Sequence, residues 1–338
     1  MKVSIAWDNR KLEPVLITYN RSADLQRTLT AFLEAGLMDI RLHVLDNAST
    51  DETASVVAAA QLQWPNLSYH RNQYNIGGNA NILRAVEITT SEYSWILGDD
   101  DEWHLDDISE LCAVLRDGKA DVIRLGWLVS PESRGKYLDI LGLTKSEKLF
   151  FASVSMISAT IIRRSVVIEH LPHAYMGIAD AYPQLVSLLR AVTRQPLLAY
   201  SMCHDLMLHT PSTTPGSFFG DLEWYSSWFR MNRFIEDRGC RIHFTGEILA
   251  YMTRNRPGAM NELLWLIKVA INYKALGVNQ WPYLFSMFAY GIGWRSRIGI
   301  LMLLYLLIPM KIAAGARKLY FRMTGRTDKG LRFDRSRI

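Results

Sequence analysis

Short apolar runs alternate with helical patterns along the first hundred or so residues of the chain. The runs are rich in β-branched and aromatic residues and read VLITY at 15–19, RLHVL at 41–45, LSYH at 67–70 and YSWIL at 93–97. Amphipathic patterns with helical spacing lie between them, at 24–35, 50–60 and 81–88. Strands that alternate with helices of about ten residues form βαβ units. The sequence therefore predicts an α/β fold with a mostly parallel sheet flanked by helices.

Composition excludes several classes of protein. Of the 338 residues, 49% are hydrophobic and 21% are charged, which is typical of globular domains and excludes intrinsic disorder, collagen and coiled coils. The 3 cysteines have no metal-ligand spacing and cannot all pair, so a disulfide scaffold is excluded and a reducing compartment is expected. Polar residues at 8–10 interrupt the N-terminal segment before it reaches the apolar length of a signal peptide, so we expect the body to be cytosolic.

Polar residues follow each of the expected strands. In parallel sheets, ligands bind beyond the carboxyl ends of the strands, near the point where the strand order reverses. The residues there read YNRSAD at 19–24, DN at 46–47, NQYNIGG at 72–78 and DDD at 99–101. A dinucleotide-binding domain needs a glycine-rich turn directly after the first strand, and YNRSAD contains no glycine. An NAD-dependent enzyme is therefore disfavoured.

Three consecutive carboxylates, Asp99, Asp100 and Asp101, follow the fourth strand directly. Like charges so close repel unless a cation or solvent relieves them. Alternate residues of an extended segment point the same way, so Asp99 and Asp101 share a face and suit Mg²⁺ or Mn²⁺, which prefer oxygen ligands. The alternative is a turn and helix-capping cluster, since aspartate is favoured in both. The strand that leads directly into the cluster favours the metal site.

Asp46 ends the second strand, in the segment LDNASTD at 45–51. One interpretation is a turn rich in capping residues before a helix. The other is a carboxylate that accepts a hydrogen bond from a nucleotide base or ribose. The residue types alone leave both interpretations open.

Four separate segments together resemble one known family. They read PVLITYNR at 14–21, LDNASTD at 45–51, NIGGNANILRAVE at 75–87 and WILGDDDEW at 95–103. In this order and spacing they are similar to the family 2 glycosyltransferases of the GT-A fold, particularly the bacterial enzymes that build surface polysaccharides, over roughly residues 12–210. The resemblance implies an inverting transfer of sugar from a nucleotide-sugar, by default a UDP-sugar, assisted by Mn²⁺ or Mg²⁺.

The same resemblance assigns residues to the nucleotide-sugar. It implies that Thr18 and Tyr19 line the base pocket and that Asp46 accepts a hydrogen bond from the base. It also implies that Asn75 and Arg84 lie by the base and the diphosphate.

For the metal, the resemblance makes Asp99 and Asp101 the D-x-D signature of the family, with Asp101 as the direct metal ligand. Asp100 would contact the ribose or the donor sugar. Some metal-dependent GT-A enzymes recruit a histidine as a further ligand, and His209 is the candidate here; the alternative is a histidine with only a structural role.

An inverting displacement needs a base that removes the proton of the acceptor hydroxyl. The family places this base in the region of Asp180, usually within a Glu-Asp pair, but here Ala179 stands where the first acid would be. Asp180 is the candidate that we favour, with Asp205 and Asp221 in reserve. The alternative for Asp180 is a helix N-cap before Pro183.

The C-terminal segment differs in character from the rest of the chain. Residues 254–338 hold 15 Lys and Arg against 3 Asp and Glu, whereas the preceding residues hold 23 against 30. The uncharged run 298–310 would make a helix of about 20 Å, shorter than a hydrocarbon core of about 30 Å. A re-entrant or interfacial arrangement of 275–316 is therefore favoured, and a two-span hairpin stays open.

Residues 311–326 predict a basic amphipathic helix, which is typical of segments that lie on an anionic membrane leaflet. The alternative is a helical subdomain that packs on the enzyme or in a homodimer. We predict a glycosyltransferase domain over 1–253, with a nucleotide-sugar half at 12–125 and an acceptor half at 126–253, and a membrane-associated extension over 254–338.

The resulting prediction is a glycosyltransferase at the cytoplasmic face of the inner membrane, attached peripherally or monotopically through 254–338. Its expected partners are a nucleotide-sugar donor and a lipid-linked (polyprenyl) saccharide acceptor, with no nucleic acid; a homo-oligomer is left open. A nucleotidyltransferase is one alternative, but it needs a phosphate loop after the first strand. A non-catalytic scaffold that binds membrane or nucleic acid through the basic tail is the other, and it leaves the aspartate cluster unexplained.

Overall fold

The computed structural model describes residues 7–180, 182–209, 221–252, 259–275, 281–291 and 307–325. The chain forms two compact units, one of residues 1–178 with 182–215 and the other of residues 179–181 with 216–338. The second unit thus begins earlier along the chain than the boundary at residue 254 that we predicted. The functional division at that boundary stays a prediction.

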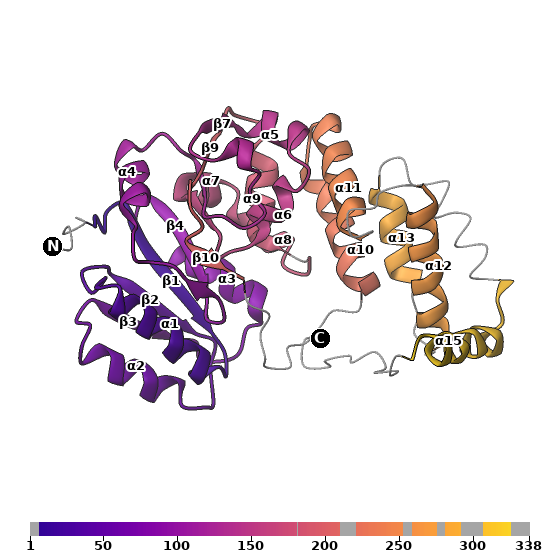
Figure 1. The fold of residues 1–338 in the computed structure, drawn as a ribbon, viewed down its shortest axis with the longest axis horizontal. Helices are drawn as coiled ribbons and strands as arrows, with labels where there is room; N and C mark the ends of the chain where they lie inside the picture. The colour runs from indigo at the N-terminus through magenta and orange to yellow at the C-terminus, as the bar shows by residue number, and fades with distance from the viewer. Residues whose placement is uncertain are drawn as a thin grey trace. The chain divides into compact units, whose positions relative to one another are not determined.

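An eight-stranded sheet forms the centre of the first unit (Figure 1). In spatial order its strands are β3 (Leu67–Arg71), β2 (Leu42–Asp46), β1 (Leu12–Thr18), β4 (Tyr93–Gly98), β8 (Thr160–Arg163), β6 (Val122–Arg124), β9 (Leu198–Ser201) and β7 (Tyr137–Asp139). The first four run parallel to one another, β8 is antiparallel to β4 and β6, and β9 is parallel to β6. The predicted, mostly parallel sheet with its four N-terminal strands is confirmed.

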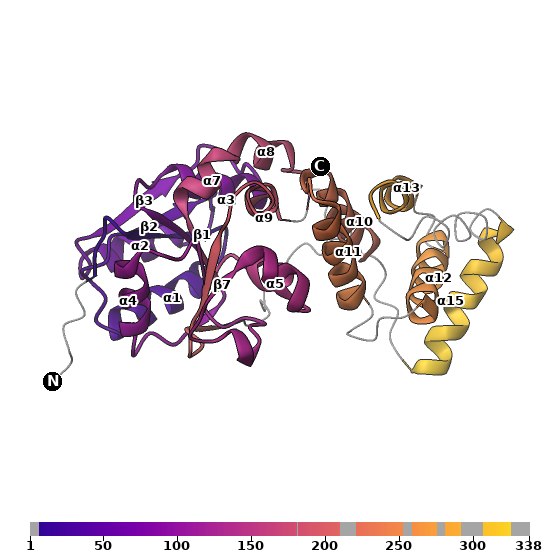
Figure 2. The ribbon, with the colours of Figure 1, turned by 90° about the horizontal axis from the view of Figure 1, so that it is seen from above.

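Helices cover both faces of this sheet (Figure 2). They are α1 (Ser22–Glu34), α2 (Thr53–Gln61), α3 (Gly78–Glu87), α4 (Ser109–Asp117), α5 (Ile140–Ser146), α6 (Phe150–Ser155), α7 (Arg164–Glu169), α8 (Leu171–Met176) and α9 (Pro183–Ala191), with a short 3-10 turn at Pro131–Ser133. Buried apolar residues of α1, α2 and α4 pack with the sheet in one apolar core. Helices α3 and α7 contact β4 from the other face, which gives the flanked α/β arrangement that we predicted.

A buried ion pair ties the C-terminal half of the sheet to the helices beside it. Arg124 of β6 donates two hydrogen bonds to the Glu147 carboxylate, at 2.9 Å and 2.5 Å. Glu147 also accepts from the backbone N–H of Ser130 and the hydroxyl of Ser133, so the buried charges are both paired and hydrogen-bonded. This network is structural, because all of its polar groups are used by the protein itself.

A small second sheet extends from the end of β4. It consists of β5 (Glu102–Trp103) and β10 (Met207–Leu208), which pair antiparallel with Leu208 opposite Glu102. Each strand has two residues, too few for a sequence pattern to predict. This ribbon brings the segment after β9 back to the end of β4.

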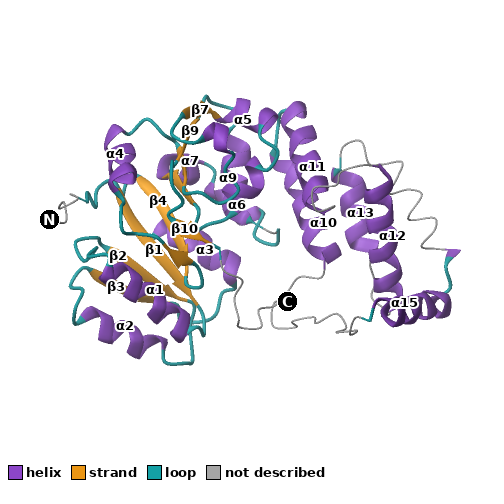
Figure 3. Ribbon diagram, viewed as in Figure 1, coloured by secondary structure: helices purple, strands orange, loops and turns teal. Residues whose placement is uncertain are grey.

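The second unit is helical in its described part, as Figure 3 shows by colour. Its helices are α10 (Asp221–Met231), α11 (Arg238–Met252), α12 (Ala259–Ala275), α13 (Trp281–Tyr290) and α15 (Met310–Thr324), with a 3-10 turn at Asn232–Phe234. Among the described residues, no helix has both the length and the apolar character needed to cross a membrane. The predicted re-entrant or spanning arrangement of 275–316 falls partly on 276–280 and 292–306, which lie outside the described residues.

Candidate functional site

The carboxyl ends of β1 and β4 lie side by side, because β1 is placed between β2 and β4. Two residues just beyond strand ends, Asn20 after β1 and Ala48 after β2, have positive φ angles of 51° and 66°. Such angles are uncommon for residues other than glycine and cluster at functional sites. Asn20 accepts from Thr50 N at 2.7 Å and donates its own N–H to Ser49 Oγ at 2.9 Å, which ties the two strand ends together.

Asp99 is held by groups from the end of β1 and the start of α1. Thr18 Oγ1 donates to its Oδ2 at 2.7 Å, and Arg21 donates to its Oδ1 at 3.1 Å. The same Arg21 nitrogen donates to Asp100 Oδ2 at 2.9 Å. Burial raises the pKa of Asp99 to about 6, against the opposing effect of Arg21, and burial also raises the pKa of Asp100. The Arg21 guanidinium therefore offsets the repulsion between neighbouring carboxylates.

Asp101 pairs with His209. Because Leu208 lies opposite Glu102 at the end of the β5–β10 ribbon, His209, the residue after β10, comes opposite Asp101. The Nδ1 atom of His209 lies 2.9 Å from Asp101 Oδ1, and this hydrogen bond raises the pKa of His209. The Trp127 ring packs edge-to-face on the imidazole at a centroid distance of 5.3 Å. The structure thus brings His209 to the aspartate cluster.

The second oxygen of Asp101 supports a cation site. Asp101 is 1% exposed, and its Oδ2 has no hydrogen-bond partner among the described residues. A buried carboxylate oxygen is costly unless a hydrogen bond or a cation satisfies it. No group of three His, Cys, Asp or Glu side chains suited to a metal occurs in the part of the chain that the structure describes. Mg²⁺ needs no such cage, since one or two carboxylates and substrate phosphates suffice for it.

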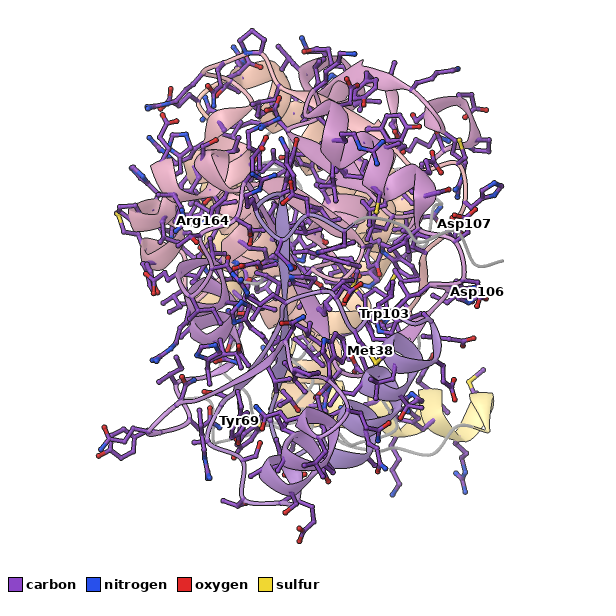
Figure 4. All side chains as sticks on the ribbon, turned by 90° about the vertical axis from the view of Figure 1, so that its left-hand side faces the viewer. Met38, Tyr69, Trp103, Asp106, Asp107 and Arg164 are labelled. Atoms are coloured by element: carbon purple, nitrogen blue, oxygen red, sulfur yellow. The ribbon has the colours of Figure 1, made fainter. Side chains whose placement is uncertain are left out.

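Asp46 lies buried at the end of β2 with both oxygens engaged. Ser49 N donates to Oδ1 at 2.8 Å, and the hydroxyl of Tyr69 on β3 donates to Oδ2 at 2.6 Å (Tyr69 is labelled in Figure 4). Arg71 Nε lies 3.6 Å from the same Oδ2. Asp46 therefore stabilises the turn after β2, whereas the N-cap position of α2 is Glu52, which makes no side-chain capping hydrogen bond. A carboxylate oxygen has two lone pairs, so these contacts also leave capacity for a base.

Asn75 belongs to a chain of asparagines that fixes the loop after β3. Asn47 Nδ2 donates to Asn75 Oδ1 at 2.7 Å, and Asn72 Nδ2 donates to Asn47 Oδ1 at 2.9 Å. Asn72 Nδ2 also lies 2.8 Å from Asn81 Oδ1, at the start of α3. These hydrogen bonds join the end of β2, the loop after β3 and the start of α3 to one another.

Tyr19 and Arg84 have exposed side chains. Tyr19 directly follows β1 and is 43% exposed, so its ring is available to a ligand at the sheet edge. Arg84 lies on α3, and its charge helps to lower the pKa of His70 on β3, for which burial is the larger cause. Within the described part of the chain, Arg84 forms no hydrogen bond or ion pair with the aspartates at 99–101, so the structure groups it with β3 rather than with the end of β4.

Asp180 belongs to the second unit, where two arginines hold its carboxylate. Arg230 of α10 donates through Nε to Oδ1 at 2.8 Å, and Arg233 donates to Oδ2 at 3.0 Å. Burial raises the pKa of Asp180, and the two guanidiniums oppose that effect. Of the reserve candidates, Asp205 pairs with Arg134 at 2.6 Å in the first unit, and the side chain of Asp221 lies outside the described residues.

Comparison with known proteins identifies the domain that carries the aspartate cluster. Residues 15–163 match the model of the family described as glycosyl transferase family 2. These residues are similar to that family, and we call them the family 2 domain. The resemblance that we noted in the sequence is confirmed over this range.

Two characterised relatives share part of the family 2 domain. Abequosyltransferase RfbV of Salmonella typhimurium is 34% identical over 112 residues, which are 31% of this chain and 32% of the relative. The GalNAc(5)-diNAcBac-PP-undecaprenol beta-1,3-glucosyltransferase of Campylobacter jejuni is 30% identical over 113 residues, which are 33% of this chain and 37% of the relative. The similarity thus spans about a third of the length of each relative.

A solved structure extends the likeness in fold beyond the family 2 domain. S. aureus TarS 1-349 in complex with UDP superposes with a TM-score of 0.55 at 12% identity, over 96% of this chain and 97% of that one. At this level of identity the match concerns the fold. It agrees with the GT-A arrangement of a mostly parallel sheet flanked by helices that we expected.

Sequence reasoning did not give Arg21, Trp127, Arg230 and Arg233 a place beside the candidate residues. Arg21 stands in the YNR motif, so its position after β1 was a usable signal. The other three reach their partners through contacts that join segments about 50 to 80 residues apart. His209 was considered, but only the register of a two-residue ribbon sets it opposite Asp101.

Proposed function

We propose that this chain is an inverting, metal-dependent glycosyltransferase that moves a sugar from a nucleotide-sugar to a hydroxyl of a lipid-linked saccharide in surface-polysaccharide synthesis. The single observation that carries the proposal is the buried Asp101, whose Oδ2 has no partner among the described residues, at the end of β4 in a family 2 domain. A donor diphosphate with its divalent cation is the ligand that such an oxygen suits.

For the metal, we propose Asp101 as the direct protein ligand and His209 as its neighbour, able to act as a second ligand once Nδ1 loses its proton. When bound, Mn²⁺ or Mg²⁺ supplies positive charge that stabilises the departing nucleoside diphosphate. Asp99 was the other predicted ligand, and both of its oxygens already accept hydrogen bonds from Thr18 and Arg21. We therefore propose that Asp99 orders the site and that Asp101 carries the coordination.

For the donor, we propose that the base lies against the exposed Tyr19 and the asparagine-fixed loop that holds Asn75, with Asp46 accepting from its edge. Thr18 would line the base pocket and hold Asp99 in place through its hydroxyl. Asp100 would face the ribose or the sugar. Arg84 would approach the nucleotide from α3. UDP is the nucleotide we expect, and the bound UDP of the TarS structure supports this choice.

For the acceptor, the Campylobacter relative supports a lipid-linked saccharide, since its name describes action on a glycan attached to PP-undecaprenol. An acceptor hydroxyl must lose its proton as it attacks, and we propose Asp180 as the base. A base works best when its pKa lies near the working pH, and burial moves the pKa of Asp180 upward in that direction.

Titration calorimetry with UDP, dTDP, GDP and CDP tests the proposed function directly. We expect one nucleotide to bind purified protein with Mn²⁺ present and to bind at least about tenfold more weakly without it, because the cation links the diphosphate to Asp101. Transfer to a polyprenyl diphosphate saccharide is then assayed with the matching sugar nucleotides. A folded protein that binds none of the four with Mn²⁺ would support the scaffold alternative instead.

We further propose that α15 holds the enzyme on the cytoplasmic face of the membrane. The helix contacts α12, and its Ala313 and Arg317 are buried. Away from these residues lie two exposed stripes with the same spacing, an apolar one and a basic one. They comprise Ile312, Leu319 and Met323, which are 62%, 57% and 78% exposed, and Lys311, Lys318 and Arg322. Adjacent apolar and cationic stripes suit the boundary between acyl chains and anionic headgroups.

Replacing Lys311, Lys318 and Arg322 together by glutamine is expected to weaken binding to phosphatidylglycerol vesicles by about 100-fold, since each cation contributes about 1 kcal/mol near an anionic surface. Vesicle co-sedimentation of the full chain measures this. The matched control replaces Lys119, Lys136 and Lys148 of the first unit, which are also exposed. Equal losses for the two triple variants would show that net charge, and not α15, governs the binding.

A further inference from the structure

The turn that follows β6 holds a tryptophan in a strained loop. Val129 N donates to Gly126 O at 3.2 Å, which closes a four-residue turn with Trp127 and Leu128 at its centre. Gly126 and Leu128 have φ angles of 130° and 54°. A left-handed conformation is unfavourable for leucine, and it persists only where the surroundings fix it.

Neighbouring groups fix this turn on both sides. A Cβ added to Gly126 would lie 2.3 Å from Asp205 Oδ1, so the backbone approaches that side chain as only glycine allows. Arg134 holds the Asp205 carboxylate at 2.6 Å. Leu206 N also donates to Leu125 O at 2.9 Å, which joins the turn to the segment that leads into β10. The conformation that presents Trp127 is thus set by contacts that are independent of the tryptophan ring.

The position of Trp127 is at the edge of the aspartate cluster. Strand β8 is antiparallel to both β4 and β6, so β6 runs in the same direction as β4. The turn after β6 therefore lies at the same end of the strands as Asp101. The indole is only partly buried, and it packs on His209, which in turn bonds Asp101. Trp127 is therefore one side chain removed from the oxygen that the proposed function assigns to the donor diphosphate.

We infer that Trp127 is a specificity-determining residue that packs against the pyranose ring of the donor sugar; this inference rests on the proposed function. The sugar is bonded directly to the diphosphate, so it comes within reach of a side chain that contacts His209. A pyranose ring has an apolar C–H face, and a partly exposed indole offers a rigid apolar surface with a polar N–H at its edge. The nucleotide and the metal ligand are bound by other residues.

The test compares UDP with UDP-glucose, UDP-galactose and UDP-N-acetylglucosamine by calorimetry in the presence of Mn²⁺, on the full chain. In the wild-type protein, the affinity for one sugar nucleotide is expected to differ from the affinity for UDP. Trp127→Leu is expected to lower the affinity for that sugar nucleotide by about 5- to 10-fold and to leave the affinity for UDP unchanged, whereas Trp127→Phe retains most of the binding. The control Trp7→Leu alters a partly buried tryptophan that bonds Leu12 O at the other end of β1.

Three outcomes would overturn the inference. Equal losses for UDP and the sugar nucleotide would show that the ring acts through His209 on the diphosphate. An unchanged affinity of Trp127→Leu for the sugar nucleotide would show that the ring does not contact the sugar. A rise in the KM for the acceptor alone, in the same variant, would show the same. A wild-type protein that binds no nucleotide would instead contradict the proposed function itself, which separates the two failures. Should Trp127→Leu fail to fold, the graded affinities of Trp127→Phe and Trp127→Tyr decide the matter.

Discussion

Replacing Asp101 by alanine is expected to lower metal-dependent sugar transfer at least about 10³-fold and to abolish the effect of Mn²⁺ on nucleotide binding. The reason is that a divalent cation contributes several kcal/mol of charge stabilisation when a diphosphate leaves, and each 1.4 kcal/mol is about a factor of ten in rate. Asp101 alone among the three aspartates has a buried oxygen without a partner in the described part of the chain. Calorimetry and a radiolabelled transfer assay measure the two effects.

Asp106→Ala is the matched control for this prediction. Asp106 is an exposed carboxylate five residues further along the chain (Figure 4). Its replacement removes the same charge and leaves the candidate metal ligand unchanged. We expect its turnover to stay within about twofold of the wild type. If Asp101→Ala binds nucleotide with an undiminished response to Mn²⁺, Asp101 is not the ligand, and the cluster at 99–101 is a turn former.

Replacing Asp180 by asparagine is expected to lower sugar transfer by about 10² to 10⁴-fold while donor binding stays within about twofold. General-base catalysis contributes an effect of this size, and asparagine keeps the shape of the side chain but cannot take the proton. Calorimetry with the donor nucleotide and initial rates of transfer separate binding from chemistry.

The arginine partners of Asp180 require a stability control. Arg230 and Arg233 donate to different oxygens of this carboxylate, so asparagine keeps one acceptor and sets an amide N–H against the other guanidinium. Thermal unfolding of Asp180→Asn and of Arg233→Gln, which removes one donor and keeps the carboxylate, separates the structural effect from the catalytic one. Normal transfer by a folded Asp180→Asn protein would move the base assignment to the reserve candidates.

The sequence predicts the part of the fold that depends on local pattern. Strands β1, β2 and β4 are largely apolar and buried because helices cover both faces of a parallel sheet, and such runs are visible without any structure. The aspartates at 99–101 were found for the same reason, since they follow the strand YSWIL directly. By contrast, β6 has three residues and its neighbours β8 and β9 come later in the chain, so no local pattern shows that it joins the sheet.

The chemical partners of the site depend on distant contacts and were harder to predict. Arg21 meets Asp99 across 78 residues, and His209 meets Asp101 across 108. Each contact follows from strand order or ribbon register, which a single sequence does not contain. The role of Asp99 as a metal ligand stays a prediction, and spacing alone could not show that Thr18 and Arg21 donate to its oxygens.

The order of strands in the sheet also bears on how the chain folds as it leaves the ribosome. Strands β1 to β4 all lie between Leu12 and Gly98 and are adjacent to one another in the sheet. They can therefore pair as soon as this segment has emerged. Strand β6 pairs with β8 and β9, so it must wait until residues beyond 160 are made. At roughly 5–20 residues per second the apolar edge of β4 stays open for several seconds. During synthesis, this edge is the part of the nascent chain that we expect chaperones to protect.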